Sequence, residues 1–104
     1  MYALTSNTTA VNNTASGYAS LYANTTGVSN SAYGYASLYN NTTGTNNTVS
    51  GASALQANTT GSYNTATGYG SLTANTTASY NDGFGRYSLK ENTCLLYTSP
   101  SPRD

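Results

Sequence analysis

The chain has 104 residues and a formal net charge of zero, and 6% of its side chains are charged. No charged residue occurs between Met1 and Asn81, and Arg86 and Lys90 are the basic residues that precede position 94. Because nucleic-acid binding depends on a basic patch, we do not expect a nucleic-acid partner. No apolar run approaches the length of a membrane span, so we expect no membrane insertion by this segment.

A unit of seventeen residues repeats through residues 1–93 without insertion or deletion. Complete copies begin at Gly17, Gly34, Gly51 and Gly68, and a partial copy begins at Gly85. The period is marked by Leu4, Leu21, Leu38, Leu55, Leu72 and Leu89 and by Asn7, Asn24, Asn41, Asn58, Asn75 and Asn92. A fixed period is typical of solenoids and is not expected of a disordered polar linker. We therefore predict that residues 1–93 form one array of about five and a half repeats.

In chain order, the first predicted element of a complete unit is a strand over residues 14–21. Small or apolar side chains at Ala15, Gly17, Ala19 and Leu21 alternate with Thr14, Ser16, Tyr18 and Ser20. Such alternation is typical of a strand with one buried face, so we place the leucine inside and the serine outside. A helix is not expected, because glycine, asparagine, threonine and serine are poor residues in helix interiors.

The next predicted element is a turn over residues 23–27, where asparagine and glycine accept positive φ and side chains can bond the backbone. Residues 28–31 then form a second short extended or turn segment. Each coil would have one clear strand, a shorter second strand and two turns. Neighbouring coils would lie about 4.8 Å apart, with leucine stacked on leucine and asparagine on asparagine.

The apolar content of each unit is small: one leucine, an occasional valine, some alanine and one or two tyrosines. A compact monomer would bury too little apolar area to offset the entropy of ordering. We therefore expect the array to be held by backbone ladders and by self-association.

The repeat ends at Thr93, and residues 94–104 follow a different pattern, CLLYTSPSPRD. This segment resembles the translation of a sequencing-library adapter, and the alternative is a genuine linker rich in serine and proline. We interpret residues 94–104 as a disordered tail that does not belong to the native protein. Cys94 then carries no information on the redox compartment. Met1 stands where the next unit has Tyr18, so we interpret the chain as a fragment of a longer repeat protein.

The motif Asn-[Ser/Thr]-Ala-x-Gly recurs at residues 13–17, 30–34 and 64–68. It resembles the head repeats of trimeric autotransporter adhesins, the YadA-like family, although their unit is a few residues shorter. The resemblance implies a left-handed parallel β-roll with three chains around one axis. It further implies display on the bacterial cell surface and attachment to a host surface or an extracellular-matrix receptor. The form GY-x-[AS]-L-Y-x-NTTG is also similar to repeats in predicted phage tail fibres.

Catalytic, cofactor-binding and metal-ligating constellations are not apparent in the sequence. The chain has no histidine, and Asp82 and Glu91 are the carboxylates that precede residue 94. No pair of acids recurs, and no serine or threonine has a base beside it, so we do not expect an enzyme or a cofactor. The match of Asn7-Thr8-Thr9 and its copies to the glycosylation sequon is interpreted as turn chemistry.

Two features of the surface leave alternatives open. The tyrosines could form an exposed aromatic band for a ligand, or they could cover the outer face or a chain–chain interface. Ice binding through a threonine ladder is a minor alternative, since it needs a flat strand with Thr-x-Thr in every coil. The strand column is irregular, with Ser16, Tyr33, Ser50, Thr67 and Phe84. The leading expectation is a structural, adhesive fibre segment, and a spacer of a phage tail fibre is the alternative.

Overall fold

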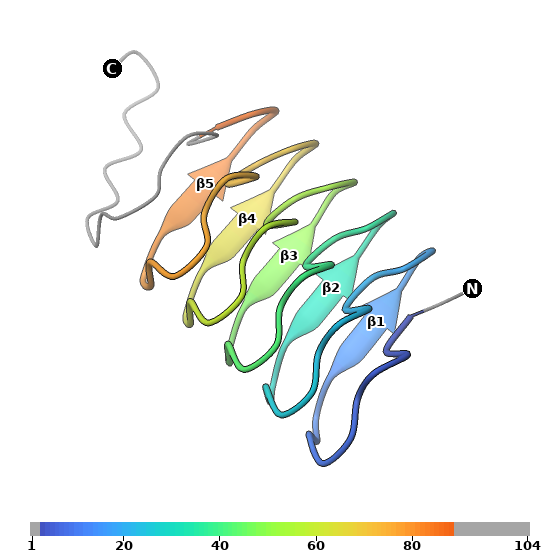
Figure 1. Ribbon diagram of the computed structural model, residues 1–104. Helices are drawn as coiled ribbons and strands as arrows, with labels where there is room; N and C mark the ends of the chain where they lie inside the picture. The colour runs from blue at the N-terminus through green and yellow to red at the C-terminus, as the bar shows by residue number, and fades with distance from the viewer. Residues whose placement is uncertain (1–2, 89–104) are drawn as a thin grey trace.

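The computed structural model describes residues 3–88, and within them the chain is an all-β solenoid without helices. Each coil contributes one short strand to a five-stranded parallel sheet in which neighbours in sequence are neighbours in space (Figure 1). The strands are β1 (Thr14–Ser16), β2 (Ser31–Tyr33), β3 (Thr48–Ser50), β4 (Thr65–Thr67) and β5 (Asp82–Phe84). The strands pair in register, so that Ala15 lies beside Ala32 and Ala32 beside Val49. The prediction of a solenoid with seventeen residues per coil is confirmed.

The strands are shorter than the sequence predicts. The predicted strand over residues 14–21 ends at Ser16, because the chain then enters the left-handed region at Gly17 (φ 124°), Ala19 (φ 61°) and Leu21 (φ 51°). Positive φ values break the two-residue alternation of an extended chain. The predicted outward position of Ser20 is therefore wrong, because Ser20 is as fully buried as Leu21, whereas Tyr18 is exposed and Ala19 is buried as predicted.

The hydroxyls of the buried serines form hydrogen bonds within their own coil. The Ser20 hydroxyl donates to the Gly17 carbonyl at 3.1 Å, and the Ser37 hydroxyl donates to Gly34 at 3.0 Å. The glycine at the bend is required for space as well as conformation. A Cβ on Gly17 would lie 2.8 Å from the carbonyl carbon and oxygen of Gly34 in the next coil.

The shorter second strand is not present in residues 3–88. The segment that follows the bend is nevertheless bonded from coil to coil: Leu21 N–H donates to Ser37 C=O at 3.1 Å, and Ala23 N–H donates to Tyr39 C=O at 3.0 Å. Positive φ at the leucine keeps this side of the coil from being a regular strand. Both sides of the solenoid are thus held by backbone hydrogen bonds between coils.

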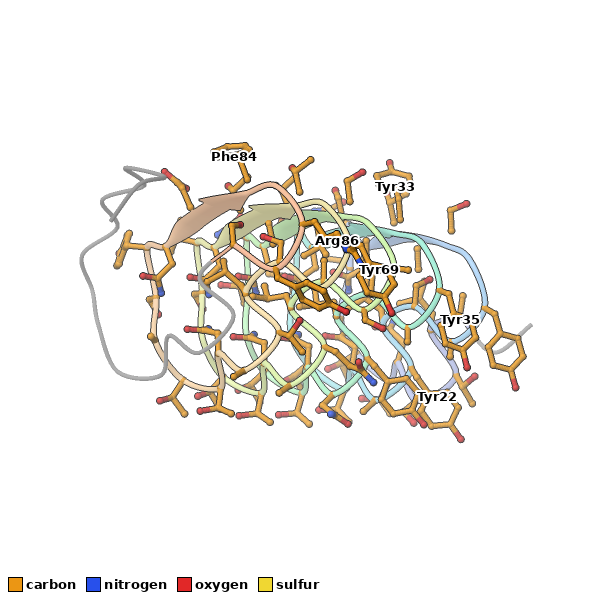
Figure 2. The ribbon with its side chains drawn as sticks, turned by 90° about the horizontal axis from the view of Figure 1, so that it is seen from above. Tyr22, Tyr33, Tyr35, Tyr69, Phe84 and Arg86 are labelled. Atoms are coloured by element: carbon orange, nitrogen blue, oxygen red, sulfur yellow. The ribbon has the colours of Figure 1, made fainter. Side chains whose placement is uncertain are left out.

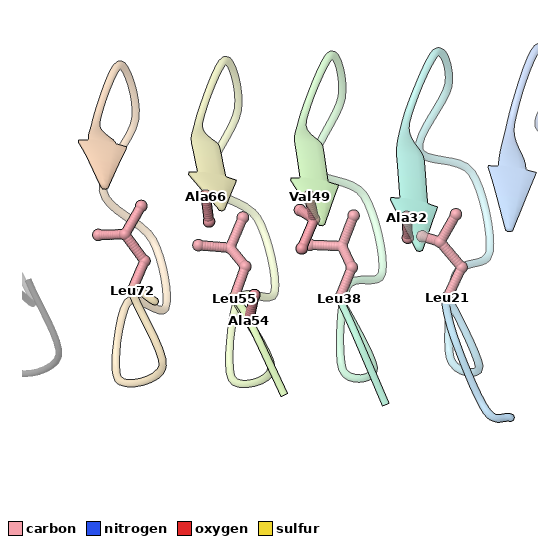
Figure 3. Packing of buried hydrophobic residues seen from close by; sticks show 8 residues of the cluster. All are labelled: Leu21, Ala32, Leu38, Val49, Ala54, Leu55, Ala66 and Leu72. Atoms are coloured by element: carbon pink, nitrogen blue, oxygen red, sulfur yellow. The ribbon is translucent and has the colours of Figure 1, made fainter. Parts of the chain in front are cut away.

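A leucine file, defined as Leu21, Leu38, Leu55 and Leu72, runs along the interior and is fully buried. It faces the inward side chains Ala32, Val49 and Ala66 of the strands (Figure 3). The predicted leucine column is confirmed. The apolar interior is narrow, because each coil adds one leucine and one small strand residue to it.

Two asparagine files make up most of the buried polar part of the interior. The first file is Asn7, Asn24, Asn41, Asn58 and Asn75. Each amide Nδ2 from the second coil onward donates to Oδ1 of the preceding asparagine at 2.8–2.9 Å. The Asn24 amide also donates to the Gly27 carbonyl at 3.0 Å, as the predicted turn chemistry requires. The predicted stacking of asparagine on asparagine is confirmed.

The second file is Asn13, Asn30, Asn47, Asn64 and Asn81, and it supplies bonds that a strand ladder would normally make. Each Oδ1 of the first four accepts the backbone N–H of the next asparagine in the file at 2.8–2.9 Å. The Asn30 amide donates to the Gly44 carbonyl at 2.8 Å. The amide side chains thus satisfy backbone groups at the turn that would otherwise be buried without partners.

The coils of the solenoid continue through residues 3–88. The predictions for residues 89–93 and for the tail over residues 94–104 lie outside the described residues. In residues 3–88, no helix meets the length and apolarity needed to cross a membrane.

Candidate interaction surface

Rows of outward side chains are the candidate interaction surfaces of the described residues. Within residues 3–88, no group of three or more histidine, cysteine, aspartate or glutamate side chains could hold a metal ion. The outward side chains form rows that run along the solenoid, because every outward position recurs after seventeen residues. The chemistry of these rows is what the molecule presents to a partner.

The first row is at the turn that contains two adjacent threonines in every coil. The hydroxyls of Thr25 and Thr42 donate to the backbone carbonyl of the corresponding threonine in the next coil at 3.2 Å. Thr8 and Thr59 do the same at 3.0 and 3.3 Å. The inner threonine of each pair is therefore part of the ladder that fixes the coil spacing.

The outer threonines form a row that we call the threonine edge: Thr9, Thr26, Thr43, Thr60 and Thr77. All five are exposed. The backbone N–H groups of Thr26 and Thr43 donate to the neighbouring coil at 3.2 Å, which fixes the backbone at each of these threonines. Within the part of the chain that the structure describes, their hydroxyls form no hydrogen bond. The threonine edge thus presents one hydroxyl and one methyl group per coil in a regular line.

The second surface is the strand face, formed by the outward side chains of β1–β5. One row is Thr14, Ser31, Thr48, Thr65 and Asp82, and the other is Ser16, Tyr33, Ser50, Thr67 and Phe84. Tyr33 and Phe84 extend from the outer side of the sheet (Figure 2) and are 46% and 60% exposed. Thr-x-Thr occurs in β4 and in no other described strand. The strand face therefore has no regular array of threonines.

The tyrosines form stacked pairs. The rings of Tyr18 and Tyr35 are 5.4 Å apart with an interplanar angle of 8°, and those of Tyr22 and Tyr39 are 5.0 Å apart with an angle of 3°. A further pair, Tyr63 and Tyr80, stacks at 5.1 Å. In each pair the two rings cover one face of each other. Such pairs stabilise the contact between two coils.

The row that contains Tyr18 is interrupted along the axis. Ala52 follows Tyr35, and the row continues with Tyr69 and Arg86. The Arg86 guanidinium lies 5.9 Å from the Tyr69 ring centre and 5.3 Å from that of Tyr87, within cation–π range (Figure 2). The outward tyrosines of residues 3–88 therefore lie in separate pairs or, like Tyr33, between smaller side chains, and do not form a continuous aromatic band.

The asparagines of the glycosylation-like triplets lie inside the molecule. Asn24, Asn41 and Asn58 are fully buried, and the Asn41 amide donates to Asn24 Oδ1 at 2.8 Å and to the Gly44 carbonyl at 3.0 Å. A glycan on such an amide would replace one of the two Nδ2 protons and would therefore break one of these bonds. The triplets thus serve the turn.

Sequence reasoning found the first asparagine file and missed the role of the second. The sequence does contain evidence for the second file, because its members also recur after seventeen residues: Asn13, Asn30, Asn47, Asn64 and Asn81.

Comparison with protein-family models, with curated proteins and with solved structures finds no match to this chain. The function has to be inferred from the surfaces themselves.

Proposed function

We propose that the chain is a structural and adhesive segment of a surface-displayed fibre, a head or stalk module of a trimeric autotransporter-type adhesin. The observation that carries the proposal is the unbroken register of five coils, in which leucine, asparagine and backbone ladders continue from one coil to the next. Such a stack forms a rod that holds its outward rows at fixed positions. The proposed role is to present these rows to a receptor at a distance from the cell.

The resemblance of the Asn-[Ser/Thr]-Ala-x-Gly motif to adhesin head repeats supports this class. The proposed location is the outside of a bacterial cell, and the proposed ligand is a host surface or an extracellular-matrix receptor. The proposed assembly is a homotrimer, because the apolar interior is thin and self-association would add buried area. A spacer in a phage tail fibre is the alternative, and it is favoured by the repeated GY-x-[AS]-L-Y-x-NTTG form.

Ice binding through the strand face is not part of the proposal, because the outward side chains of β1–β5 differ from coil to coil. An adhesive fibre does not require such regularity. It requires a rigid support and a few exposed groups that bind.

The assembly is tested with the chain alone and with the chain fused to a trimeric coiled coil. Circular dichroism should show a β-rich spectrum for the fusion and a poorly folded spectrum for the chain whenever sedimentation shows it to be a monomer. A cooperative β-fold in the isolated monomer would contradict the trimer.

Adhesion is tested with beads that carry the fusion. We expect the beads to bind immobilised extracellular-matrix proteins or host-cell layers more strongly than beads carrying a scrambled-repeat control.

The sequence of the complete gene distinguishes the adhesin from the phage tail fibre. A membrane β-barrel anchor would support the adhesin, whereas a collar or an intramolecular chaperone domain would support the phage fibre.

A further inference from the structure

We propose that the threonine edge faces the axis of the trimer, so that each outer threonine meets the same threonine of two further copies of the chain. This assignment rests on the proposed trimer and names the surface that forms it. Three properties of the outward rows in residues 3–88 support the assignment. They are the uniformity of each row along the axis, its charge and its capacity to form hydrogen bonds.

The first argument is uniformity along the axis. In a parallel assembly around an axis that follows the solenoid, each coil meets the same coil of its partners. A continuous contact therefore needs side chains of one size at every level. Among the outward side-chain rows of residues 3–88, those of the two-threonine turn keep the same residue in all five coils.

The other rows alternate between small and large side chains. The outer row of the strand face places Tyr33 between Ser16 and Ser50. The row of Tyr18 contains Ala52, and the row of Tyr63 begins with Asn12 and Ser29. Each of these rows would leave gaps at some levels of a parallel interface and collisions at others. Their variation suits a surface that faces solvent or a ligand.

The second argument is charge. Asp82 lies on the strand face, and Arg86 lies in the row of Tyr18. If either row faced the axis, three carboxylates or three guanidinium groups would be brought together at one level. Like charges in contact across an interface oppose association. The threonine edge has no charged side chain in any of its five coils.

The third argument is hydrogen bonding. A threonine hydroxyl has one proton to donate and two lone pairs to accept with. Three hydroxyls around a three-fold axis can therefore close a ring in which each donates to the next. The outer threonine hydroxyls form no hydrogen bond within residues 3–88, so they can take part in such a ring, and their methyl groups would be buried beside it. Five coils would give five successive rings.

Disulfide cross-linking of the full chain tests the assignment. Cys94 is first replaced by serine, and Thr43→Cys is compared with Thr67→Cys, the matched control on the strand face. A disulfide requires Cα atoms about 4.4–6.8 Å apart, which a row on the axis provides. Three equivalent cysteines give one disulfide and one unpaired thiol. We therefore expect Thr43→Cys to yield covalent dimers from up to about two-thirds of the chains, and no covalent trimers.

Sedimentation of the unoxidised proteins separates the possible results. Thr67→Cys should sediment as a trimer and give no covalent dimer. A trimer that cross-links through Thr67→Cys and not through Thr43→Cys overturns the assignment and leaves the proposed trimer intact. A parent chain that folds cooperatively and remains monomeric at all concentrations contradicts the proposed trimer itself, and the assignment with it.

A charge scan gives a second readout that does not depend on oxidation. Thr43→Arg would bring three guanidinium groups together at the axis, and we expect the concentration at which trimers dissociate to rise by about 100-fold or more. Thr67→Arg changes the same residue type on the strand face and should leave that concentration within about twofold. Equal effects of the two substitutions would overturn the assignment.

Discussion

The leucine file and the two asparagine files are both buried, but they hold neighbouring coils together in different ways. The leucines make contacts without a fixed direction, and their contribution depends on the apolar area they remove from water. The amides make directional bonds, and a displaced coil would leave buried donors and acceptors without partners. Burial and register therefore come from different parts of the coil. This division explains how so thin an apolar interior can accompany so regular a stack.

The largest loss of stability is expected from Asn41→Asp, which disrupts the first asparagine file. The substitution keeps the shape but places a carboxylate against two acceptors, Asn24 Oδ1 and the Gly44 carbonyl. A buried charge without a partner costs about 3–5 kcal/mol. Urea unfolding of the assembled protein at neutral pH should show this loss.

The matched control is Asn40→Asp, because Asn40 is the preceding residue and is exposed. Its effect on the free energy of unfolding should stay within about 0.5 kcal/mol. Acidification should return part of the stability of Asn41→Asp, since a protonated carboxyl can again donate to Gly44. A loss of equal size in both variants would show that the amide bonds do not set the register.

Leu55→Ala tests the leucine file by removing one of its side chains. Leu55 is fully buried in a central coil, and such a change typically costs about 2–5 kcal/mol. Leu4→Ala should cost clearly less, because Leu4 is half-buried in the first coil and has one neighbouring coil in the described residues. Thermal unfolding followed by circular dichroism measures both losses. Similar losses at the two positions would mean that the array unfolds as one unit.

Ser37→Ala tests a buried hydroxyl at the position that precedes Leu38 of the leucine file. Ser37 is fully buried and donates to Gly34, so its replacement should cost about 0.5–1.5 kcal/mol. The loss should be near the lower end, because Ala54 occupies the same position in the next coil. Ala54→Ser is the reverse substitution and should be neutral or slightly stabilising. Destabilisation by both changes would show that each coil has its own packing at this position.

The smallest effect is expected outside both interiors, for Tyr35→Leu. Tyr35 is 59% exposed, and its ring stacks on that of Tyr18 at 5.4 Å. Loss of this stacking should cost about 0.5 kcal/mol, the low end for aromatic pairs. Ala52→Tyr would extend the row and should gain a similar amount. A loss above that of Ser37→Ala would show that the tyrosine rows support the fold as much as the interior does.

The sequence predicts the fold class, the coil length, the leucine file and the first asparagine file, because a period without insertions determines which residues lie side by side. The strand length and the burial of Ser20 could not be predicted in the same way. Leu21 and Leu38 have φ of 51° and 54°, a conformation that costs a non-glycine residue about 1–2 kcal/mol. Local preference opposes this conformation, and it persists because bonds to the neighbouring coils determine the path of the backbone.

The interaction surface was predicted least well. The Asn-Thr-Thr triplets mark both threonines of each turn, but they do not distinguish the outer Thr26 from the inner Thr25. The exposure of the outer threonines and the engagement of the inner hydroxyls became evident from the coil-to-coil bonds. The stacking of the tyrosines in pairs likewise depends on ring orientation, which spacing alone does not give.

The constant coil length has a consequence for how such a fibre can evolve. An in-frame duplication or deletion of one repeat adds or removes a whole coil, and the asparagines and leucines of the flanking coils find the same partners as before. Each event would change the reach of the rod by about 4.8 Å without disturbing its ends. Recombination between neighbouring repeats could therefore adjust the distance over which the fibre acts in small, uniform steps.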